Sequence, residues 1–295
     1  MIEKSLISNI IANPYKISEL EFPTISQIIH KAVDILKEEY LILELNFSES
    51  DEQAFVIGDI HGNLNSLQRL VEIIEQDNPK YVIFLGDIVD RGPYQLECLI
   101  LVLALKIQQV NKYYLIKGNH ESLEINQYYG FFQDFINRFK EPKKFEEVLA
   151  FYKVLPLSAM INKTVLCLHG GIPEEIDILK KIKSIKTQDS DLVSKNSAKS
   201  LMQILWNDPK SKLNGFSDSF RGIGIKNFGE DVFNDFMREN KLNYLIRSHE
   251  AFPEGYKWFF NKKLLSIFSS ANYRGKNPAS YAIITKDSIR PKLVT

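Results

Sequence analysis

The chain has 295 residues, of which 44% are hydrophobic, and its 37 basic and 37 acidic residues leave no net charge. This length can bury one large core, and the balanced charge excludes the broad basic surface that holds nucleic acid. No apolar run approaches the roughly 20 residues that a membrane-spanning helix needs, so we expect no membrane partner. Cys98 and Cys167 both lie in apolar runs, which predicts buried thiols in a cytoplasmic protein, with the nucleus as an alternative compartment.

The first 50 residues predict a helical lead-in. Between residues 17 and 45, apolar residues recur at helical spacing, which is more typical of a packing face than of a functional surface. We expect this segment to pack on a catalytic domain of residues 51–295, the whole forming one compact domain.

After residue 52, short apolar runs end in glycine and a polar residue, and helical patterns follow them. Runs at 54–57, 81–85 and 113–117, with helices at 64–76 and 93–108, predict parallel βαβ units and an α/β fold. Further strands are expected at 164–168, 244–247, 264–269 and 281–285, and residues 173–199 predict a surface excursion with one or two short helices. Five phenylalanines are expected to pack beneath the helices: Phe131, Phe132, Phe135, Phe139 and Phe151.

Five motifs at the ends of predicted strands contain four of the five histidines, and only His30 stands apart, where we expect a structural role. Ligands of such folds bind beyond the carboxyl ends of strands. The motifs are Gly58-Asp59-Ile60-His61-Gly62, Gly86-Asp87-Ile88-Val89-Asp90-Arg91-Gly92, Gly118-Asn119-His120-Glu121, His169-Gly170-Gly171 and Arg247-Ser248-His249-Glu250.

These motifs predict a centre for two divalent metal ions. Imidazole, carboxylate and amide oxygen suit manganese, iron or zinc, and manganese is our first expectation. Six candidate ligands exceed what one tetrahedral ion needs: Asp59, His61, Asp87, Asn119, His169 and His249. A pair of ions sharing a bridge activates water for the hydrolysis of a phosphoester.

Each motif alone has a structural alternative. Gly58 to Gly62 fits a strand-ending turn, and Asn119 fits the N-cap of a helix. The five motifs in this order favour the metal centre over these alternatives.

In this order, the motifs resemble the phosphoprotein phosphatase family within the calcineurin-like metallophosphoesterase superfamily. Later segments resemble signatures of its type 1 and type 2A catalytic subunits: Ile204-Leu205-Trp206-Asn207-Asp208-Pro209, Phe220-Arg221-Gly222-Ile223-Gly224 and Ser269-Ser270-Ala271-Asn272-Tyr273. The resemblance implies a β-sandwich of mixed sheets flanked by helices. It also implies a serine/threonine protein phosphatase that acts on phosphoproteins or phosphopeptides by in-line attack of a metal-activated water.

The resemblance further implies residue roles. Asp59, His61 and Asp87 hold one metal, while Asp87 bridges to a second metal held by Asn119, His169 and His249. His120 is the general acid, and Asp90 supports it. Phosphate is bound by Arg91, Arg221 and Asn119, beside Tyr273.

Phe220 departs from the family pattern, which usually has Asp before Arg-Gly, so a different group must orient Arg221 here. Two alternative functions stay open. One is a small-molecule phosphoesterase, such as a dinucleoside polyphosphate hydrolase, and the other is a catalytically silent scaffold. Regulatory subunits are not specified by any motif.

Overall fold

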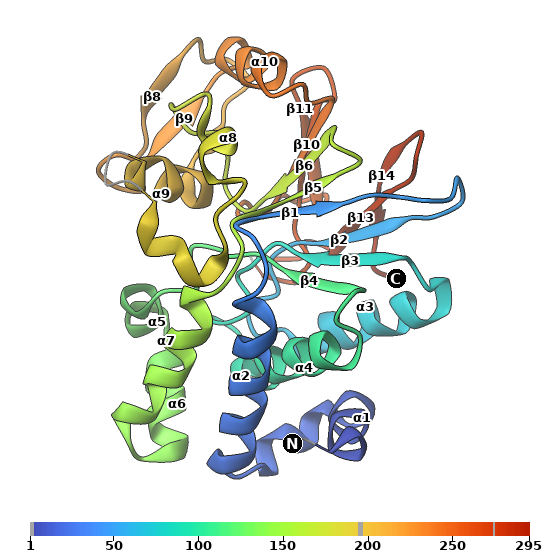
Figure 1. Cartoon of the computed structure of the whole chain (residues 1–295), viewed down its shortest axis with the longest axis vertical. Coiled ribbons are helices and arrows are strands. Elements are labelled where there is room, and N and C mark those ends of the chain that lie inside the picture. The colour runs from blue at the N-terminus through green and yellow to red at the C-terminus, as the bar shows by residue number, and fades with distance from the viewer. Residues whose placement is uncertain (1–2, 194–196, 274) are drawn as a thin grey trace.

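The computed structural model describes every residue except 1–2, 194–196 and 274, so part of the 173–199 excursion lies outside the described residues. Two mixed β-sheets lie near the middle of the molecule, with a layer of helices below them in Figure 1 and a smaller helical and β region above. The predicted mixed sheets flanked by helices are confirmed.

The first sheet has six strands in the order β1-β5-β6-β10-β12-β11. The pairs β1/β5, β6/β10 and β10/β12 are parallel, whereas β5/β6 and β11/β12 are antiparallel. The strands are β1 (Ile42–Leu45), β5 (Ser158–Ile161), β6 (Val165–Leu168), β10 (Tyr244–Arg247), β12 (Leu264–Ile267) and β11 (Tyr256–Phe259).

The second sheet has five strands in the order β14-β13-β2-β3-β4. Strands β2, β3 and β4 are parallel, and β13 joins β2 antiparallel. Along β2, Ala54 and Val56 pack towards the first sheet, while Phe55 and Ile57 pack among the helices, as the period of two in a strand requires. The strands are β2 (Ala54–Ile57), β3 (Tyr81–Phe84), β4 (Tyr113–Leu115), β13 (Ser280–Ile284) and β14 (Ile289–Leu293).

The lower helical layer surrounds α4, which is buried along most of its length. Helices α1 and α2 pack against α4. The phenylalanine prediction is confirmed, since Phe131, Phe135 and Phe151 are buried and Phe132 and Phe139 pack against the same core. The elements are α1 (Lys4–Ala12), η1 (Pro14–Glu19), α2 (Phe22–Leu36), α3 (Leu64–Asp77), α4 (Gln95–Gln108), α5 (Leu123–Tyr129), α6 (Phe131–Phe139), η2 (Pro142–Phe145) and α7 (Glu146–Lys153).

The upper region carries short helices and a three-stranded sheet in the order β7-β9-β8. The short helices of the 173–199 excursion are confirmed, whereas the small sheet was not predicted. The elements are α8 (Ile178–Ile182), η3 (Thr187–Leu192), α9 (Ala198–Trp206), β7 (Asp208–Pro209), β8 (Phe216–Asp218), β9 (Lys226–Phe228) and α10 (Glu230–Glu239).

The helical prediction for residues 17–45 is wrong at its end. Helix α2 stops at Leu36, and residues 42–45 form strand β1, where Glu44 is exposed and its neighbours are buried. The apolar spacing of residues 41–45 fits a strand as well as a helix, and pairing with β5 decides between them. No helix of the described residues is long and apolar enough to cross a membrane.

Candidate active site

The five motifs follow strands of both sheets. Strands β2, β3 and β4 run parallel in one sheet, and β6 and β10 run parallel in the other, so the carboxyl ends in each group point the same way. The loops that follow bring their polar side chains together under almost complete burial, with Asp59 and Asp87 each 1% exposed and His169 0% exposed. The structure thus brings the candidate residues together at the strand ends, where the sequence analysis expected a ligand site.

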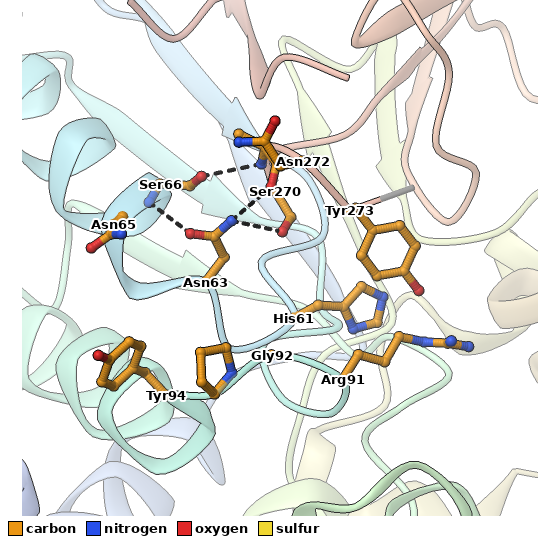
Figure 2. Close-up of a pocket in the computed structure, with 12 residues that line it drawn as sticks. His61, Asn63, Asn65, Ser66, Arg91, Gly92, Tyr94, Ser270, Asn272 and Tyr273 are labelled. Atoms are coloured by element: carbon orange, nitrogen blue, oxygen red, sulfur yellow. Dashed lines mark hydrogen bonds between the residues drawn. The ribbon is translucent and has the colours of Figure 1, made fainter. Parts of the chain in front are cut away.

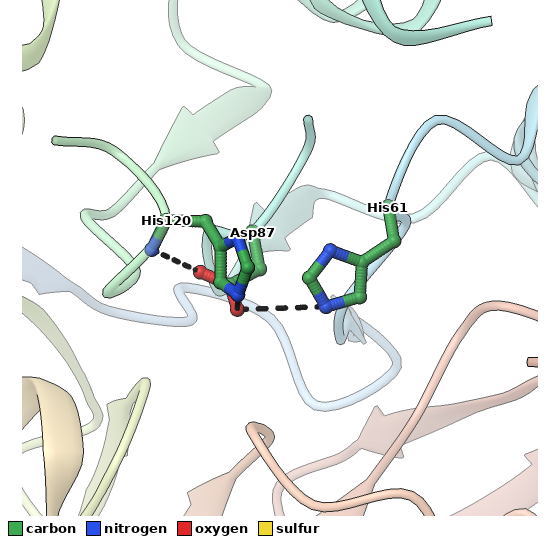
Figure 3. Close-up of side chains that lie close together, drawn as sticks. All are labelled: His61, Asp87 and His120. Atoms are coloured by element: carbon green, nitrogen blue, oxygen red, sulfur yellow. Dashed lines mark hydrogen bonds and ion pairs between the residues drawn. The ribbon is translucent and has the colours of Figure 1, made fainter. Parts of the chain in front are cut away.

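Asp87 lies at the centre of this cluster. Its Oδ2 atom is 3.7 Å from Nε2 of His61, 3.4 Å from Nε2 of His169 and 3.9 Å from Nε2 of His120. Figure 3 shows Asp87 between His61 and His120. Two groups of potential metal-binding side chains share Asp87, one with His61 and His120 and the other with His169 and His249.

Backbone carbonyls fix the tautomers of two of these histidines. Nδ1 of His61 lies 3.0 Å from the carbonyl of Val89, and Nδ1 of His169 lies 2.8 Å from the carbonyl of Leu85. Because a carbonyl oxygen only accepts, each Nδ1 carries the hydrogen, and the Nε2 lone pairs of the neutral rings face the Asp87 carboxylate. Such facing lone pairs are satisfied by a proton or by a metal ion between them.

The pKa shifts of His61 and His169 indicate that this site favours a bound positive charge. Burial opposes a charge on His169, but the carboxylates of Asp87 and Asp59 outweigh burial and raise the pKa of His169 to about 9. For His61, burial again acts downward, and Asp59 and Asp87 raise the pKa overall. A divalent ion would satisfy the same lone pairs as the proton does, so the residues fit a metal.

Asn119, His249 and Asp59 complete the donor set. Oδ1 of Asn119 lies 2.8 Å from Nε2 of His169, and Nδ1 of His249 lies 3.2 Å from it. Nε2 of His249 is buried without a hydrogen-bond partner among the described residues. Oδ2 of Asp59 lies 3.5 Å from Nε2 of His61. All six predicted ligands thus meet around Asp87 and fit two ions that share it.

Glu121 bridges two of the site loops, a role that was not predicted from the sequence. Its carboxylate accepts hydrogen bonds from the backbone N–H groups of Asp87, Ile88 and Gly118 at 2.9, 3.1 and 2.7 Å. Burial and the neighbouring Asp87 charge raise the pKa of Glu121 to about 7. Its place in the Gly118-Asn119-His120-Glu121 motif was the available signal.

His120 is held by a buried carboxylate, as the sequence predicted. Nδ1 of His120 lies 2.7 Å from Oδ2 of Asp90, which is 0% exposed. The amide of Asn126 donates to the same oxygen at 2.8 Å, and the Tyr152 hydroxyl donates to Oδ1 of Asn126 at 2.9 Å. Neither Asn126 nor Tyr152 was predicted from the sequence, because Asp90 and Tyr152, the side-chain partners of Asn126, come from distant segments.

Two arginines border the cluster. The guanidinium of Arg91 lies 3.9 Å from the ring centroid of Tyr129 and 5.6 Å from that of Tyr273. Tyr273 in turn stacks on His61, with ring centroids 5.0 Å apart and planes 10° apart. Arg91 and Tyr273 therefore flank the predicted metal ligand His61 (Figure 2).

The group that orients Arg221 is Asp208. Nε of Arg221 donates to Oδ2 of Asp208 at 2.6 Å, and the buried Arg247 donates to Oδ1 of the same carboxylate at 2.9 Å. Phe220 stands where the family usually has an acid, and the acid that holds Arg221 here comes from strand β7. Arg221 keeps a carboxylate anchor.

A cavity of about 620 Å³ opens beside Arg91 and Tyr273 (Figure 2). Asn63 forms part of its wall and donates to the hydroxyl of Ser270 at 3.2 Å and to the carbonyl of Ala271 at 2.9 Å. His61 and Arg91 both line this cavity, which therefore opens directly beside the candidate site.

Comparisons with known proteins agree with this geometry. A protein serine/threonine phosphatase from Saccharomyces cerevisiae, described as similar to human phosphatase PP5, is 27% identical with a TM-score of 0.85, over 99% of this chain and 96% of that one. A cold-active protein tyrosine phosphatase of a psychrophilic Shewanella species is 17% identical with a TM-score of 0.61, over 89% of this chain and 84% of that one, and shows the fold alone.

A family model for calcineurin-like phosphoesterases matches residues 54–253. The matched span contains the five motifs and all six predicted metal ligands. Since it covers more than half of the sequence, the chain belongs to the calcineurin-like phosphoesterase family.

Proposed function

We propose that this protein is a serine/threonine protein phosphatase that hydrolyses phosphoserine and phosphothreonine. The proposal rests chiefly on one arrangement, in which the buried Asp87 lies among three imidazoles, one of them held by Asp90. The likeness to a yeast protein serine/threonine phosphatase over almost the whole chain supports the substrate class.

Asp59, His61 and Asp87 would hold one divalent ion, and Asp87, Asn119, His169 and His249 the other. When bound, such a pair lowers the pKa of a water and neutralises charge on phosphoryl oxygens. The backbone carbonyls at Nδ1 of His61 and of His169 keep both Nε2 lone pairs directed inward. Manganese is our first candidate, because the donor set suits a borderline first-row ion.

His120 supplies the proton that the leaving serine or threonine oxygen needs. An alkoxide is a poor leaving group, and a positioned general acid typically contributes about 10²–10⁴-fold. Asp90, at 2.7 Å from Nδ1, fixes the ring and stabilises its positive charge.

Arg91, Arg221 and Asn119 bind and orient the phosphate, with Tyr273 lining the same side of the site. Guanidinium groups suit this task because their planar donor pairs match phosphate oxygens. Arg91 is kept in place by Tyr129 and Tyr273.

We also propose the substrates, the domain organisation and the location of the protein. Substrates are phosphoproteins or phosphopeptides, and residues 51–295 form the catalytic domain on which residues 1–50 pack. An intracellular location is supported by the free, buried cysteines Cys98 and Cys167.

Phosphate release from a phosphothreonine peptide and from a dinucleoside tetraphosphate tests this proposal. Both are measured after chelation and after manganese is added back. We expect manganese-dependent hydrolysis of the peptide. Preference for the dinucleotide would overturn the protein phosphatase proposal and favour a small-molecule phosphoesterase with the same ligands.

A further inference from the structure

One surface loop beside the candidate site exposes two large apolar side chains. Residues 219–225 form a closed turn, in which the N–H of Ser219 donates to the carbonyl of Ile225 at 3.0 Å. Gly222 and Gly224 adopt positive φ angles there. Phe220 is 89% exposed and Ile223 is 101% exposed, the highest values among the large apolar side chains of the described residues. Exposed apolar groups beside an active site indicate a contact surface.

Phe220 is joined to the candidate phosphate site through its neighbour Arg221. The ring centroid of Phe220 lies 5.8 Å from the Arg221 guanidinium carbon. Asp208 accepts a hydrogen bond from Arg221 and also pairs with Arg247, two residues before His249. The Arg221 side chain is therefore anchored at the site and not free to swing away, and the exposed ring lies at the rim.

We propose that Phe220 contacts the substrate residue next to the phosphoserine or phosphothreonine and favours an apolar side chain there. This inference rests on the proposed protein phosphatase function. If Arg221 binds the phosphate, the substrate chain passes close to Phe220, because consecutive Cα atoms are only about 3.8 Å apart. The molecule that contacts Phe220 is thus the same peptide whose phosphate Arg221 binds.

The chemistry of the ring sets the preference. An apolar substrate side chain that packs on Phe220 leaves water together with the ring, whereas a lysine or glutamate gains no charge partner from it. Phe220 therefore favours an apolar neighbour over a charged one.

Phosphothreonine peptides that differ only at the neighbouring residues test this preference. We expect kcat/KM to be about tenfold higher with leucine than with lysine beside the phosphothreonine, which is the usual scale for one apolar contact. Phe220→Ala should remove most of this preference through a higher KM. Phe220→Asp should reverse the preference towards lysine. Turnover of 4-nitrophenyl phosphate, which has no neighbouring residue, should stay unchanged in Phe220→Ala.

Leu192→Ala is the matched control, because Leu192 is 76% exposed and belongs to a different segment. It should leave the preference intact. Peptide turnover with no leucine preference, or a preference that survives Phe220→Ala, would overturn the inference alone. Turnover of 4-nitrophenyl phosphate without turnover of any peptide would overturn the proposed function, and this inference with it.

Discussion

Replacing Asp90 by asparagine tests the proposed acid most directly. The Asp90 carboxylate accepts three hydrogen bonds: Nδ1 of His120 and Nδ2 of Asn126 donate to Oδ2, and the N–H of Phe131 donates to Oδ1 at 3.0 Å. An asparagine has one acceptor oxygen, so at least one of these donors must face its NH₂ group. We expect Asp90→Asn to lose about 1–3 kcal/mol of stability for each buried donor left unsatisfied.

The effect on turnover should exceed the effect on stability. Without the carboxylate, the protonated form of His120 is less stable and its ring is no longer held in one orientation. The value of kcat on a phosphothreonine peptide should therefore fall by up to about 10²–10⁴-fold. An aryl phosphate should be affected less, because its leaving group needs little protonation. His120→Asn should show the same substrate dependence while metal content stays near two ions per chain, as a two-ion site predicts.

A double-mutant cycle separates this role from a structural one. If Asp90 acts through His120, the double variant should be no slower on the peptide than His120→Asn alone. Asp134→Asn is the control, because it removes an acid from the neighbouring helix α6 outside the cluster. Multiplicative losses in the double variant, or equal losses on both substrates, would refute the reasoning.

Three further predictions concern the metal site, the thiols and a buried ion pair. Asp87→Asn should lower the content of both metals, because it removes the shared anionic ligand; unchanged stoichiometry on elemental analysis would contradict this. Burial raises the pKa of the Cys98 and Cys167 thiols, so iodoacetamide at mildly alkaline pH should label neither in the folded protein, and mass spectrometry would detect a failure. Burial also raises the pKa of Glu39 and lowers that of its partner Lys106, so the fold favours the neutral form of each group. The double variant Glu39→Gln with Lys106→Met should therefore lose little stability in urea unfolding, and a large loss would contradict this. Because the folded state binds the Glu39 proton more tightly than the unfolded state does, wild-type stability relative to the double variant should rise as the pH falls towards 4.5; a fall would refute this sign.

The candidate ligands could be identified from the sequence because each has a local signal. Asp59 and Asp87 each follow an apolar run and a glycine, and His169 lies between an apolar run and a glycine. Parallel strands bring such positions together. Strand β1 was not predictable in the same way, because its four residues continue an apolar pattern that also fits a helix. Only the pairing with β5, more than a hundred residues later, distinguishes the two.

The supporting contacts were not predictable because they join distant segments. Asp208 pairs with Arg221 and Arg247, which lie 13 and 39 residues further along the chain. Tyr152 reaches Asp90 only through Asn126. Motif spacing identifies the groups that face the centre, whereas these partners depend on how separate loops fold against one another.

The backbone conformation of the site is a further physical reason why its loops could not be predicted from the sequence. His61, Asp87, Asp90, Arg91 and His249 all have positive φ angles, between 47° and 73°. Each costs roughly 1–2 kcal/mol for a residue other than glycine, so the local sequence opposes the conformation that the site uses. The N–H groups of Ile60 and His61 both donate to the carbonyl of Asp87, and Glu121 accepts from its N–H, which offsets part of this cost. The loops are thus held by contacts with one another. Glu121→Gln removes the charge that accepts hydrogen bonds from the N–H groups of Asp87, Ile88 and Gly118, so it should lower the metal content measured by elemental analysis without changing a predicted ligand.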